Sequence, residues 1–205
     1  MIAVVILAGG EGRRIGGSKP LRTLAGKTLL DHALALAQHW SPLIGISVRD
    51  AASAFHSTGA SFLPDTAGCG PIAGIASALS FGRSSGVGLV LTIPCDTPFL
   101  PLDMVDRLSD ALVPSATTAI AASGGRIHPA CALWRVNADA ALPPYLASGR
   151  ASLNGFAEAL GAVEVEWPVA PVDPFFNINS ATELAEAEAL IKTQQFRLPR
   201  LQLVG

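Results

Sequence analysis

The chain has 205 residues, of which 50% are hydrophobic and 15% are charged. This composition excludes an intrinsically disordered chain, and the length suffices for one domain with a sizeable core. The formal net charge of −2 argues against a general nucleic-acid-binding protein, because such proteins carry a basic surface that neutralises phosphates.

Short apolar segments alternate with amphipathic ones along the chain. The β-branched run Ile2–Ala8 predicts a strand buried on both faces, and the apolar stripe over Thr28–Trp40 predicts the first helix. Later segments predict strands at residues 43–48, 60–63, 88–93, 117–122 and 130–134, and helices at 51–56, 72–81, 101–112 and 181–192. This alternation is typical of an α/β fold with a mostly parallel sheet and helices on both faces.

We expect residues 1–192 to form a single domain, and the sequence predicts no structure for the C-terminal tail, 193–205. Cys69, Cys95 and Cys131 are far apart and form no C-x-x-C pair, so we expect reduced thiols in a cytoplasmic protein. The apolar runs are shorter than the about 18 residues of a membrane helix, and no leader with a basic flank opens the chain. Neither a membrane segment nor a secretion signal is therefore expected.

A glycine-rich loop follows the first predicted strand, with the sequence GGEGRRIGGSK over residues 9–19. Glycines let backbone N–H groups approach an oxyanion closely, and Arg13 and Lys19 add positive charge. Residues 1–30 hold five basic residues against one acid, an excess that suits a triphosphate. Two common phosphate motifs fail, because Ser18 stands where a P-loop needs lysine and Ile15 where a dinucleotide fingerprint needs glycine.

Other polar residues also follow predicted strands, where ligands bind in α/β sheets. Asp96 lies between two prolines in the sequence PCDTPF, and a carboxylate in such a stiff turn is a candidate Mg²⁺ ligand. Asp65 is either a nucleotide ligand or a local backbone cap. On its own, His128 suits a structural role, and Asn179 or Ser180 suits a helix N-cap.

Taken together, these segments resemble the molybdenum cofactor guanylyltransferase family. Residues 7–19 resemble its signature L-A-G-G-x-x-x-R-M-G-x-x-K, and residues 70–75 resemble its G-P-L-A-G loop. The blocks PCDTPF at 94–99, HP at 128–129 and FFNIN at 175–179 match further family blocks in the same order. The resemblance covers about residues 2–191.

The resemblance implies a Rossmann-like nucleotidyltransferase fold that uses GTP and Mg²⁺, with molybdopterin as the acceptor and pyrophosphate as the leaving group. It also implies molybdoenzymes or their chaperones as candidate partners. Carried over onto this sequence, it puts nucleotide contacts on Leu7, Ala8, Gly9, Gly10, Lys19, Asp65 and Asp96. The catalytic residues would be Arg13, Lys19 and Asp96, the metal ligands Asp96 and Asn179, and the acceptor-side residues His128, Asn177 and Asn179.

The expected reaction is an in-line attack of the acceptor phosphate on the α-phosphorus of GTP. Arg13 and Lys19 would offset charge on the departing pyrophosphate. No general base is needed, because the acceptor phosphate is already ionised at neutral pH. The absence of an obvious nucleophile paired with a base in the sequence agrees with this mechanism.

The expected strand ends also predict where the site residues lie relative to one another. Asp96 and Asn179 both follow extended segments, so we expect them to converge at one edge of the sheet on one Mg²⁺, with Asn177 as the alternative second ligand. Lys19 and Asp96 should face solvent. His128 should meet the acceptor phosphate as a cation or hydrogen-bond donor.

Two alternatives remain open. A related cytidylyltransferase would resemble L-A-A-G at the first turn, so Gly9 favours guanine. A non-catalytic nucleotide-binding relative is suggested by Val48, since the family often has asparagine before the arginine at this position, as a nucleotide contact. Lys19 and Asp96 are both present, which favours an enzyme.

Overall fold

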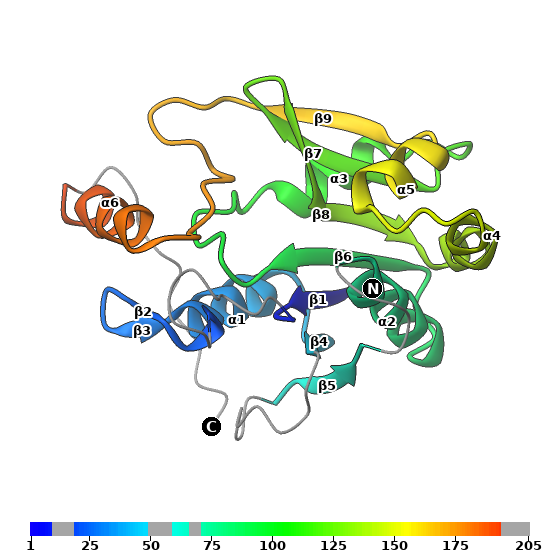
Figure 1. Cartoon of the computed structure of the whole chain (residues 1–205), viewed down its shortest axis with the longest axis horizontal. Helices are drawn as coiled ribbons and strands as arrows, with labels where there is room; N and C mark the ends of the chain where they lie inside the picture. The colour runs from blue at the N-terminus through cyan, green and yellow to red at the C-terminus, as the bar shows by residue number, and fades with distance from the viewer. Residues whose placement is uncertain (10–18, 49–58, 66–70, 194–205) are drawn as a thin grey trace.

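A central sheet organises the molecule (Figure 1). The computed structural model describes residues 1–9, 19–48, 59–65 and 71–193, and within them seven strands pair in the order β5-β4-β1-β6-β8-β7-β9. The strands are β1 (Ala3–Leu7), β4 (Ile44–Val48), β5 (Ser61–Pro64), β6 (Leu89–Pro94), β7 (Thr118–Ser123), β8 (Arg126–Arg135) and β9 (Val163–Trp167). Strand β8 is antiparallel to β6 and β7, and the other neighbouring pairs are parallel. The predicted α/β fold with a mostly parallel sheet is confirmed.

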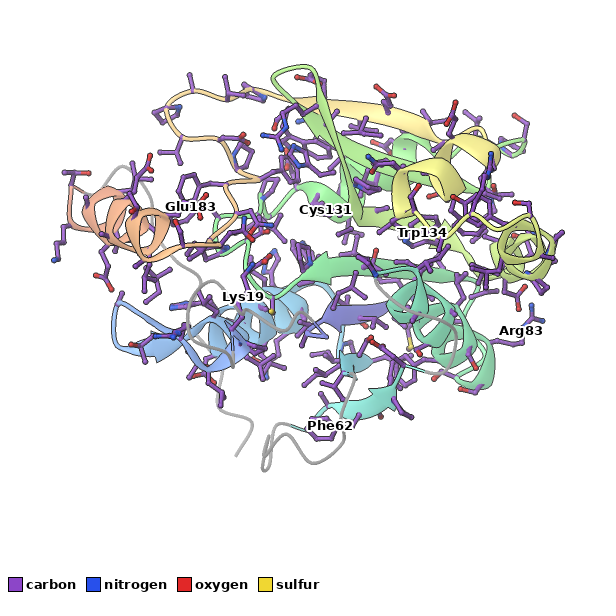
Figure 2. The ribbon with its side chains drawn as sticks, in the orientation of Figure 1. Lys19, Phe62, Arg83, Cys131, Trp134 and Glu183 are labelled. Carbon is purple, nitrogen blue, oxygen red and sulfur yellow. The ribbon has the colours of Figure 1, made fainter. Side chains whose placement is uncertain are left out.

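Helices cover both faces of this sheet, as predicted. They are α1 (Leu29–Trp40), α2 (Pro71–Ser84), α3 (Met104–Ala111), α4 (Leu142–Ala147), α5 (Leu153–Ala159) and α6 (Ala181–Lys192). Val4 and Ile6 of β1 pack in the core under α1 and α3, whereas Ala3 and Val5 pack against α2 on the opposite face. Trp134 of β8 lies on the α2 face, enclosed by α2, α4 and α5 (Figure 2). No helix in the described ranges is long and apolar enough to cross a bilayer.

Helix α6 packs against the N-terminal part of the chain. A small hairpin of β2 (Thr23–Leu24) and β3 (Lys27–Thr28) precedes α1, and Leu24 shares a hydrophobic cluster with Ile178 and α6. Glu188 of α6 also accepts a hydrogen bond from Ala25 N at 2.7 Å. This packing brings the segment before α6 next to the 3₁₀ turn Lys19–Leu21.

Local chemistry shifts two of the predicted helix starts. Thr28, expected as the first residue of the first helix, is instead the N-cap of α1, and its hydroxyl accepts a hydrogen bond from Asp31 N at 3.0 Å. Helix α3 begins at Met104, because Pro101 lies in a preceding turn in which its carbonyl accepts from Met104 N. The helix expected at 51–56 lies outside the described residues.

The region between β8 and α6 differs most from expectation. Strand β8 starts at Arg126 rather than at residue 130, so His128 lies within the strand and not before it. Helices α4 and α5 and strand β9 were not anticipated. Strand β9 alternates exposed and more buried residues, as an edge strand does, and α4 carries proline in its first turn. Of these elements, only the start of α5 lines the cavity described below.

A tight hairpin turn links β7 to β8. Gly124 and Gly125 have φ angles of +55° and +73°, the pair of positive values that a two-residue hairpin turn demands and that residues with a Cβ rarely adopt. The turn sets Ser123 directly opposite Arg126 and Ala121 opposite His128. The conformation of two glycines therefore fixes which side chains of β7 and β8 face each other beside the cavity.

Gly82 sets how closely α2 approaches β6. A Cβ at this position would overlap Val90 Cγ2 and lie 2.9 Å from Val136 Cγ1, and β-branched side chains have little rotamer freedom to yield. We expect Gly82→Ala to lower the free energy of unfolding by about 1–2 kcal/mol, with overpacking exceeding the gain in helix propensity. Chemical denaturation tests this, with Gly88→Ala as the control because no atom lies within 4 Å of its Cβ position. Equal stability of the two variants would contradict the prediction.

Candidate active site

The carboxyl ends of β1 and β6 lie side by side and carry the first group of site residues. Cys95 N donates a hydrogen bond to Leu7 O at 3.2 Å, which holds the turn after β6 against the end of β1. Ala8 N donates to Ser47 O at 2.9 Å, so the start of the glycine-rich loop lies between β4 and β6. Leu7, Ala8 and Gly9 are thus at the edge expected for the nucleotide. Gly10 and Arg13 lie outside the described residues.

The segment before α6 joins this edge from far along the chain. Ile178 N donates a hydrogen bond to Asp96 O at 2.9 Å, and this bond brings Asn177 and Asn179 beside Asp96. Ser180 is the N-cap of α6, since its hydroxyl accepts from Glu183 N at 3.2 Å. Asn179 is therefore not the helix cap, and its amide is available to the site.

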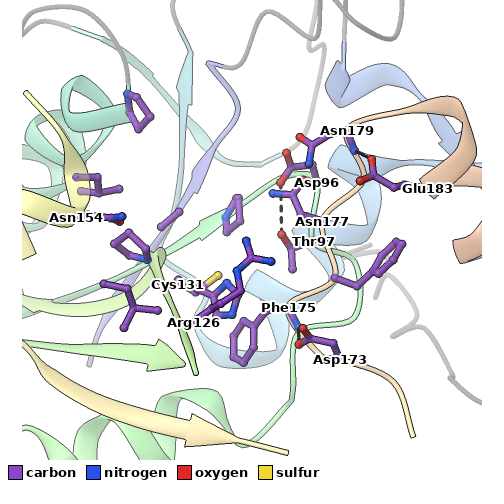
Figure 3. A pocket seen from close by; sticks show the side chains of 18 of the residues that line it. Asp96, Thr97, Arg126, Cys131, Asn154, Asp173, Phe175, Asn177, Asn179 and Glu183 are labelled. Atoms are coloured by element: carbon purple, nitrogen blue, oxygen red, sulfur yellow. Dashed lines mark hydrogen bonds between the residues drawn. The ribbon is translucent and has the colours of Figure 1, made fainter. Parts of the chain in front are cut away.

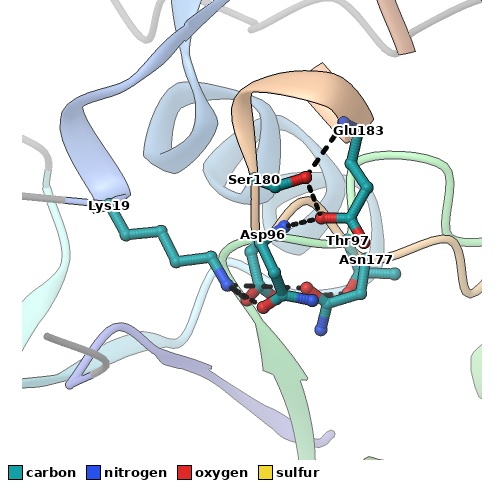
Figure 4. A network of polar contacts seen from close by, with 7 residues as sticks. Lys19, Asp96, Thr97, Asn177, Ser180 and Glu183 are labelled. Atoms are coloured by element: carbon teal, nitrogen blue, oxygen red, sulfur yellow. Dashed lines mark hydrogen bonds and ion pairs between the residues drawn. The ribbon is translucent and has the colours of Figure 1, made fainter. Parts of the chain in front are cut away.

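The ammonium group of Lys19 lies at the centre of these residues (Figure 4). It forms an ion pair with Asp96 Oδ2 and donates to Asn179 Oδ1 at 2.6 Å and to Asn177 Oδ1 at 3.5 Å. Three oxygens from two distant segments therefore surround one cation. Thr97 Oγ1 contacts the other carboxylate oxygen of Asp96 at 3.4 Å.

Lys19 and Asp96 are buried, contrary to the expectation that both face solvent. Lys19 is 8% exposed and Asp96 is 9% exposed. A buried charge is costly unless an opposite charge and hydrogen bonds compensate it, and here each charge compensates the other. The polar, glycine-rich sequence around Lys19 predicted an exposed side chain, and no local pattern indicated partners in the turn after β6 and in the segment before α6.

Glu183 orients Asn179 without contacting Lys19 directly. Its carboxylate accepts hydrogen bonds from Asn179 N at 2.7 Å and from the Ser180 hydroxyl at 2.9 Å. These donors, the Asn179 N–H first, lower the pKa of Glu183, so it stays ionised well into the acid range. A serine followed three residues later by glutamate is a helix-start signature readable from sequence, and it could have revealed this contact.

The oxygens around Lys19 suit a hard divalent cation. Asp96 offers a carboxylate and Asn177 and Asn179 offer amide oxygens, the ligand types that Mg²⁺ prefers. Across the part of the chain that the structure describes, no group of three or more His, Cys, Asp or Glu side chains could hold a metal ion. A single carboxylate with neutral oxygens binds Mg²⁺ weakly, so phosphate oxygens would have to complete the coordination.

Asp65 has a partner of its own at the end of β5. Ser47 of β4 donates a hydrogen bond from its hydroxyl to Asp65 Oδ1, and Asp65 N donates to Val48 O at 3.0 Å. These bonds hold the carboxylate at the same sheet edge as Gly9. The side chain of Val48 is 3% exposed and packs in the core, so it offers the site no polar group.

A cavity of about 790 Å³ opens beside Asp96 (Figure 3). Its walls come from the start of β8, the start of α5 and the segment before α6, and they include Asp96, His128, Asn177 and Asn179. The proposed metal ligands and the proposed acceptor-side residues therefore line one space. Arg126 is the one lysine or arginine among the described residues that line it, and sequence analysis did not single it out.

His128 is held by residues that sequence analysis missed. Its Nε2 lies 2.8 Å from Ser123 Oγ, and that hydroxyl lies 2.9 Å from Asp173 Oδ1. The imidazole stacks on Phe175 at a centroid distance of 4.6 Å. Burial lowers the pKa of His128, and Arg126 lowers it further, against the opposing effect of Asp173. The ring is thus neutral at neutral pH, so of the two expected forms, a cation or a hydrogen-bond donor, the cation is not the one present.

The described cysteines are unsuited to nucleophilic chemistry. Cys95 and Cys131 are free thiols, each almost fully buried, and burial raises the pKa of both well above the ordinary value for a thiol. Cys131 reaches the cavity wall but stays protonated. Cys69 lies outside the described residues.

This arrangement agrees with comparisons with known proteins. Residues 4–165 match the MobA-like NTP transferase domain. The chain belongs to the MobA-like NTP transferase family. It is 38% identical to the molybdenum cofactor guanylyltransferase of Cereibacter sphaeroides over 192 residues, which cover 92% of this chain and 96% of that one. The guanylyltransferase of a Bradyrhizobium species is 39% identical over 91% of each chain.

A solved MobA-like structure has the same fold. The molybdopterin-guanine dinucleotide biosynthesis protein A from Archaeoglobus fulgidus superposes with a TM-score of 0.72 and 26% identity, over 93% of this chain and 99% of that one. The predicted family and the predicted nucleotidyltransferase fold are thus confirmed. Membership in the MobA-like family makes this chain a nucleotidyltransferase.

Proposed function

We propose that this chain transfers the guanylyl group of GTP to the phosphate of molybdopterin carrying molybdenum, with release of pyrophosphate. The observation that carries the proposal is the group of Lys19, Asp96, Asn177 and Asn179 at the carboxyl edge of the sheet, beside a cavity large enough for an acceptor. Relatives more than a third identical over nearly the whole chain bear the guanylyltransferase name, which supports the same substrates here.

Asp96 and Asn179 would hold Mg²⁺, with Asn177 as the alternative amide ligand. Bound there, the ion would neutralise charge on the phosphates of the nucleotide and the acceptor. Lys19 lies within reach of the same carboxylate, and its ammonium would offset charge on the departing pyrophosphate once it exchanges Asp96 for phosphate oxygens. The glycine-rich loop and Arg13 would bind the triphosphate.

The acceptor phosphate would attack the α-phosphorus in line with the bond to pyrophosphate. That phosphate is ionised at neutral pH, so no side chain must remove a proton. The protonated thiols of Cys95 and Cys131 agree with a direct transfer that has no covalent enzyme intermediate. The enzyme's task is then to align two anionic substrates and to compensate their charge.

We expect the protein to select guanine over cytosine. Gly9 lies in the turn after β1, at the position of the second alanine in the L-A-A-G pattern of cytidylyltransferases. Backbone groups at such a turn can form hydrogen bonds to the edge of a base. GTP should displace labelled GTP at least about tenfold better than CTP, which corresponds to about 1.4 kcal/mol. Equal displacement, or release of pyrophosphate with CTP at the same rate, would favour the cytidylyltransferase alternative.

The proposed setting of the reaction is the cytoplasm, where molybdoenzymes or their chaperones would receive the product. A non-catalytic relative is the second candidate, and it rests on Val48 alone. Pyrophosphate release that depends on both GTP and molybdopterin separates the two, because a non-catalytic relative would bind nucleotide without releasing pyrophosphate.

A further inference from the structure

The hydroxyl of Ser123 connects two residues of the cavity wall. It lies 2.8 Å from His128 Nε2 and 2.9 Å from Asp173 Oδ1. Asp173 Oδ1 also accepts a hydrogen bond from Phe175 N at 2.9 Å, which fixes the orientation of the carboxylate. Ser123 itself is 2% exposed. The directions of the two hydrogen bonds to the Ser123 hydroxyl decide which tautomer of His128 is present.

The proton positions follow from the number of donors. An ionised aspartate only accepts hydrogen bonds, so the single proton of the Ser123 hydroxyl must point to Asp173. The serine oxygen then accepts at its other contact, and His128 Nε2 must carry the proton that it receives. In a neutral imidazole the second nitrogen, Nδ1, is then unprotonated and is a hydrogen-bond acceptor.

The environment of His128 keeps it neutral. Burial and the Arg126 charge lower its pKa, while Asp173 and Glu166 raise it by less. The ring also stacks on Phe175, with ring planes 15° apart, which holds its orientation. At neutral pH the imidazole of His128, which lines the cavity, therefore carries an unprotonated Nδ1.

Nδ1 is available to a ligand. No hydrogen bond to it is present within the described residues, and the imidazole that carries it lines the cavity. Arg126, two positions earlier on β8, projects from the same face of the strand and lines the same cavity (Figure 3). Its guanidinium forms no hydrogen bond or ion pair in the described part of the chain.

We propose that Ser123 and Asp173 are positioning residues that hold His128 in the Nε2–H tautomer, and that His128 Nδ1 accepts a hydrogen bond from an N–H group of the acceptor's heterocycle. The assignment of the acceptor rests on the proposed transfer to a pterin phosphate. His128 would then distinguish acceptors by their ring, whereas a phosphate, which only accepts at neutral pH, has no donor for Nδ1. The permanently charged Arg126 is the better partner for an anionic group.

The tautomer can be measured on the free protein. In ¹⁵N-histidine-labelled protein, the ¹⁵N shifts distinguish a protonated from an unprotonated ring nitrogen. We expect His128 at neutral pH to have Nε2 protonated and Nδ1 unprotonated, with the exposed His39 as the internal reference. Ser123→Ala should give a mixture of tautomers. Thr118→Val, which removes another buried hydroxyl from β7, should leave the His128 signals unchanged.

Asp173→Asn separates charge from shape. The amide oxygen can still accept from Ser123 and Phe175 N, so the tautomer should persist. Loss of the carboxylate removes the charge that raises the pKa of His128, and the titration of the ring should move to lower pH. A shift to higher pH, or a protonated Nδ1 at neutral pH, would overturn the inference.

Acceptor kinetics test the ligand. His128→Ala should raise the KM for molybdopterin about tenfold, the loss of one hydrogen bond, with little change in kcat or in GTP affinity. In the parent protein, KM should rise as pH falls through the lowered pKa of His128, since protonation turns Nδ1 from an acceptor into a donor. A KM that falls with acidity would mean that a cationic His128 binds the phosphate, and the inference would be wrong.

The outcomes separate the two proposals. If the parent protein transfers GMP to molybdopterin while His128 has a protonated Nδ1, or while His128→Ala has an unchanged KM, the inference fails and the proposed function stands. If the tautomer is as expected but no transfer to molybdopterin occurs, the proposed function is wrong. The assignment of the acceptor's heterocycle as the ligand of Nδ1 is then wrong as well.

Discussion

Asp96→Ala is expected to abolish nucleotide transfer, with a loss of at least about 10³-fold in turnover. The variant removes the one carboxylate at the proposed metal position and the counter-ion of Lys19. It should also lower the free energy of unfolding by about 2–3 kcal/mol, because a largely buried ammonium group keeps only the amide oxygens of Asn177 and Asn179. GTP binding in the absence of metal should survive.

The measurements are pyrophosphate release, GTP binding with and without Mg²⁺, and chemical denaturation. Asp96→Asn keeps the shape of the side chain and removes its charge, so it separates metal binding from packing. Asp110→Ala on α3, where the carboxylate is exposed, is the matched control and should match the parent in every assay. A folded Asp96→Asn protein with normal Mg²⁺-dependent turnover would exclude Asp96 as a metal ligand.

Lys19→Met is expected to lower kcat by about 10²–10³-fold, the usual cost of removing one charged donor from a site of developing negative charge. Methionine retains the apolar stem of the side chain, and Lys27→Met on the exposed hairpin is the matched control. Truncation of an exposed loop residue lowers the free energy of unfolding by less than about 1 kcal/mol. Lys19→Met should lower it by more, because Lys19 is buried and Asp96 would lose its counter-ion.

A double-mutant cycle tests whether the two charges act as a pair. Lys19→Met with Asp96→Asn removes both ions, so the double variant should be more stable than the sum of the single changes predicts. Additive stability losses would mean that the ion pair contributes nothing to folding. Normal turnover of folded Lys19→Met would show that Lys19 is structural.

Much of the fold could be predicted because local patterns determine it. The apolar run of β1 and the helical stripes of α1 and α6 carry periodicities that specify strand or helix without reference to distant residues. Strand β9 was missed because its pattern VEVEW is short, lies at an edge of the sheet and alternates with glutamate. The start of α3 depended on a turn at Pro101, which propensity alone does not reveal.

The identities of the site residues came from sequence, but their environment did not. Lys19 meets Asn179 across 160 positions, and Ser123 meets Asp173 across 50 positions, and no local pattern encodes either pairing. The burial of Lys19 and the neutral state of His128 are consequences of these long-range contacts. A sequence motif specifies which groups a site contains, whereas packing decides their protonation and their partners.

The hydrogen bond from Ile178 N to Asp96 O has a consequence for the order in which the site is completed during synthesis. Strands β1, β4 and β6 are made long before Asn177 and Asn179, and a growing chain can fold this half of the sheet first. Until the last segment leaves the ribosome, Lys19 and Asp96 can pair, but the amide oxygens around them are missing. A chain that stops short of residue 177 would thus carry the glycine-rich loop and the Asp96 carboxylate, but it would lack two of the three side-chain oxygens around Lys19. Such a chain could bind nucleotide without being able to transfer it.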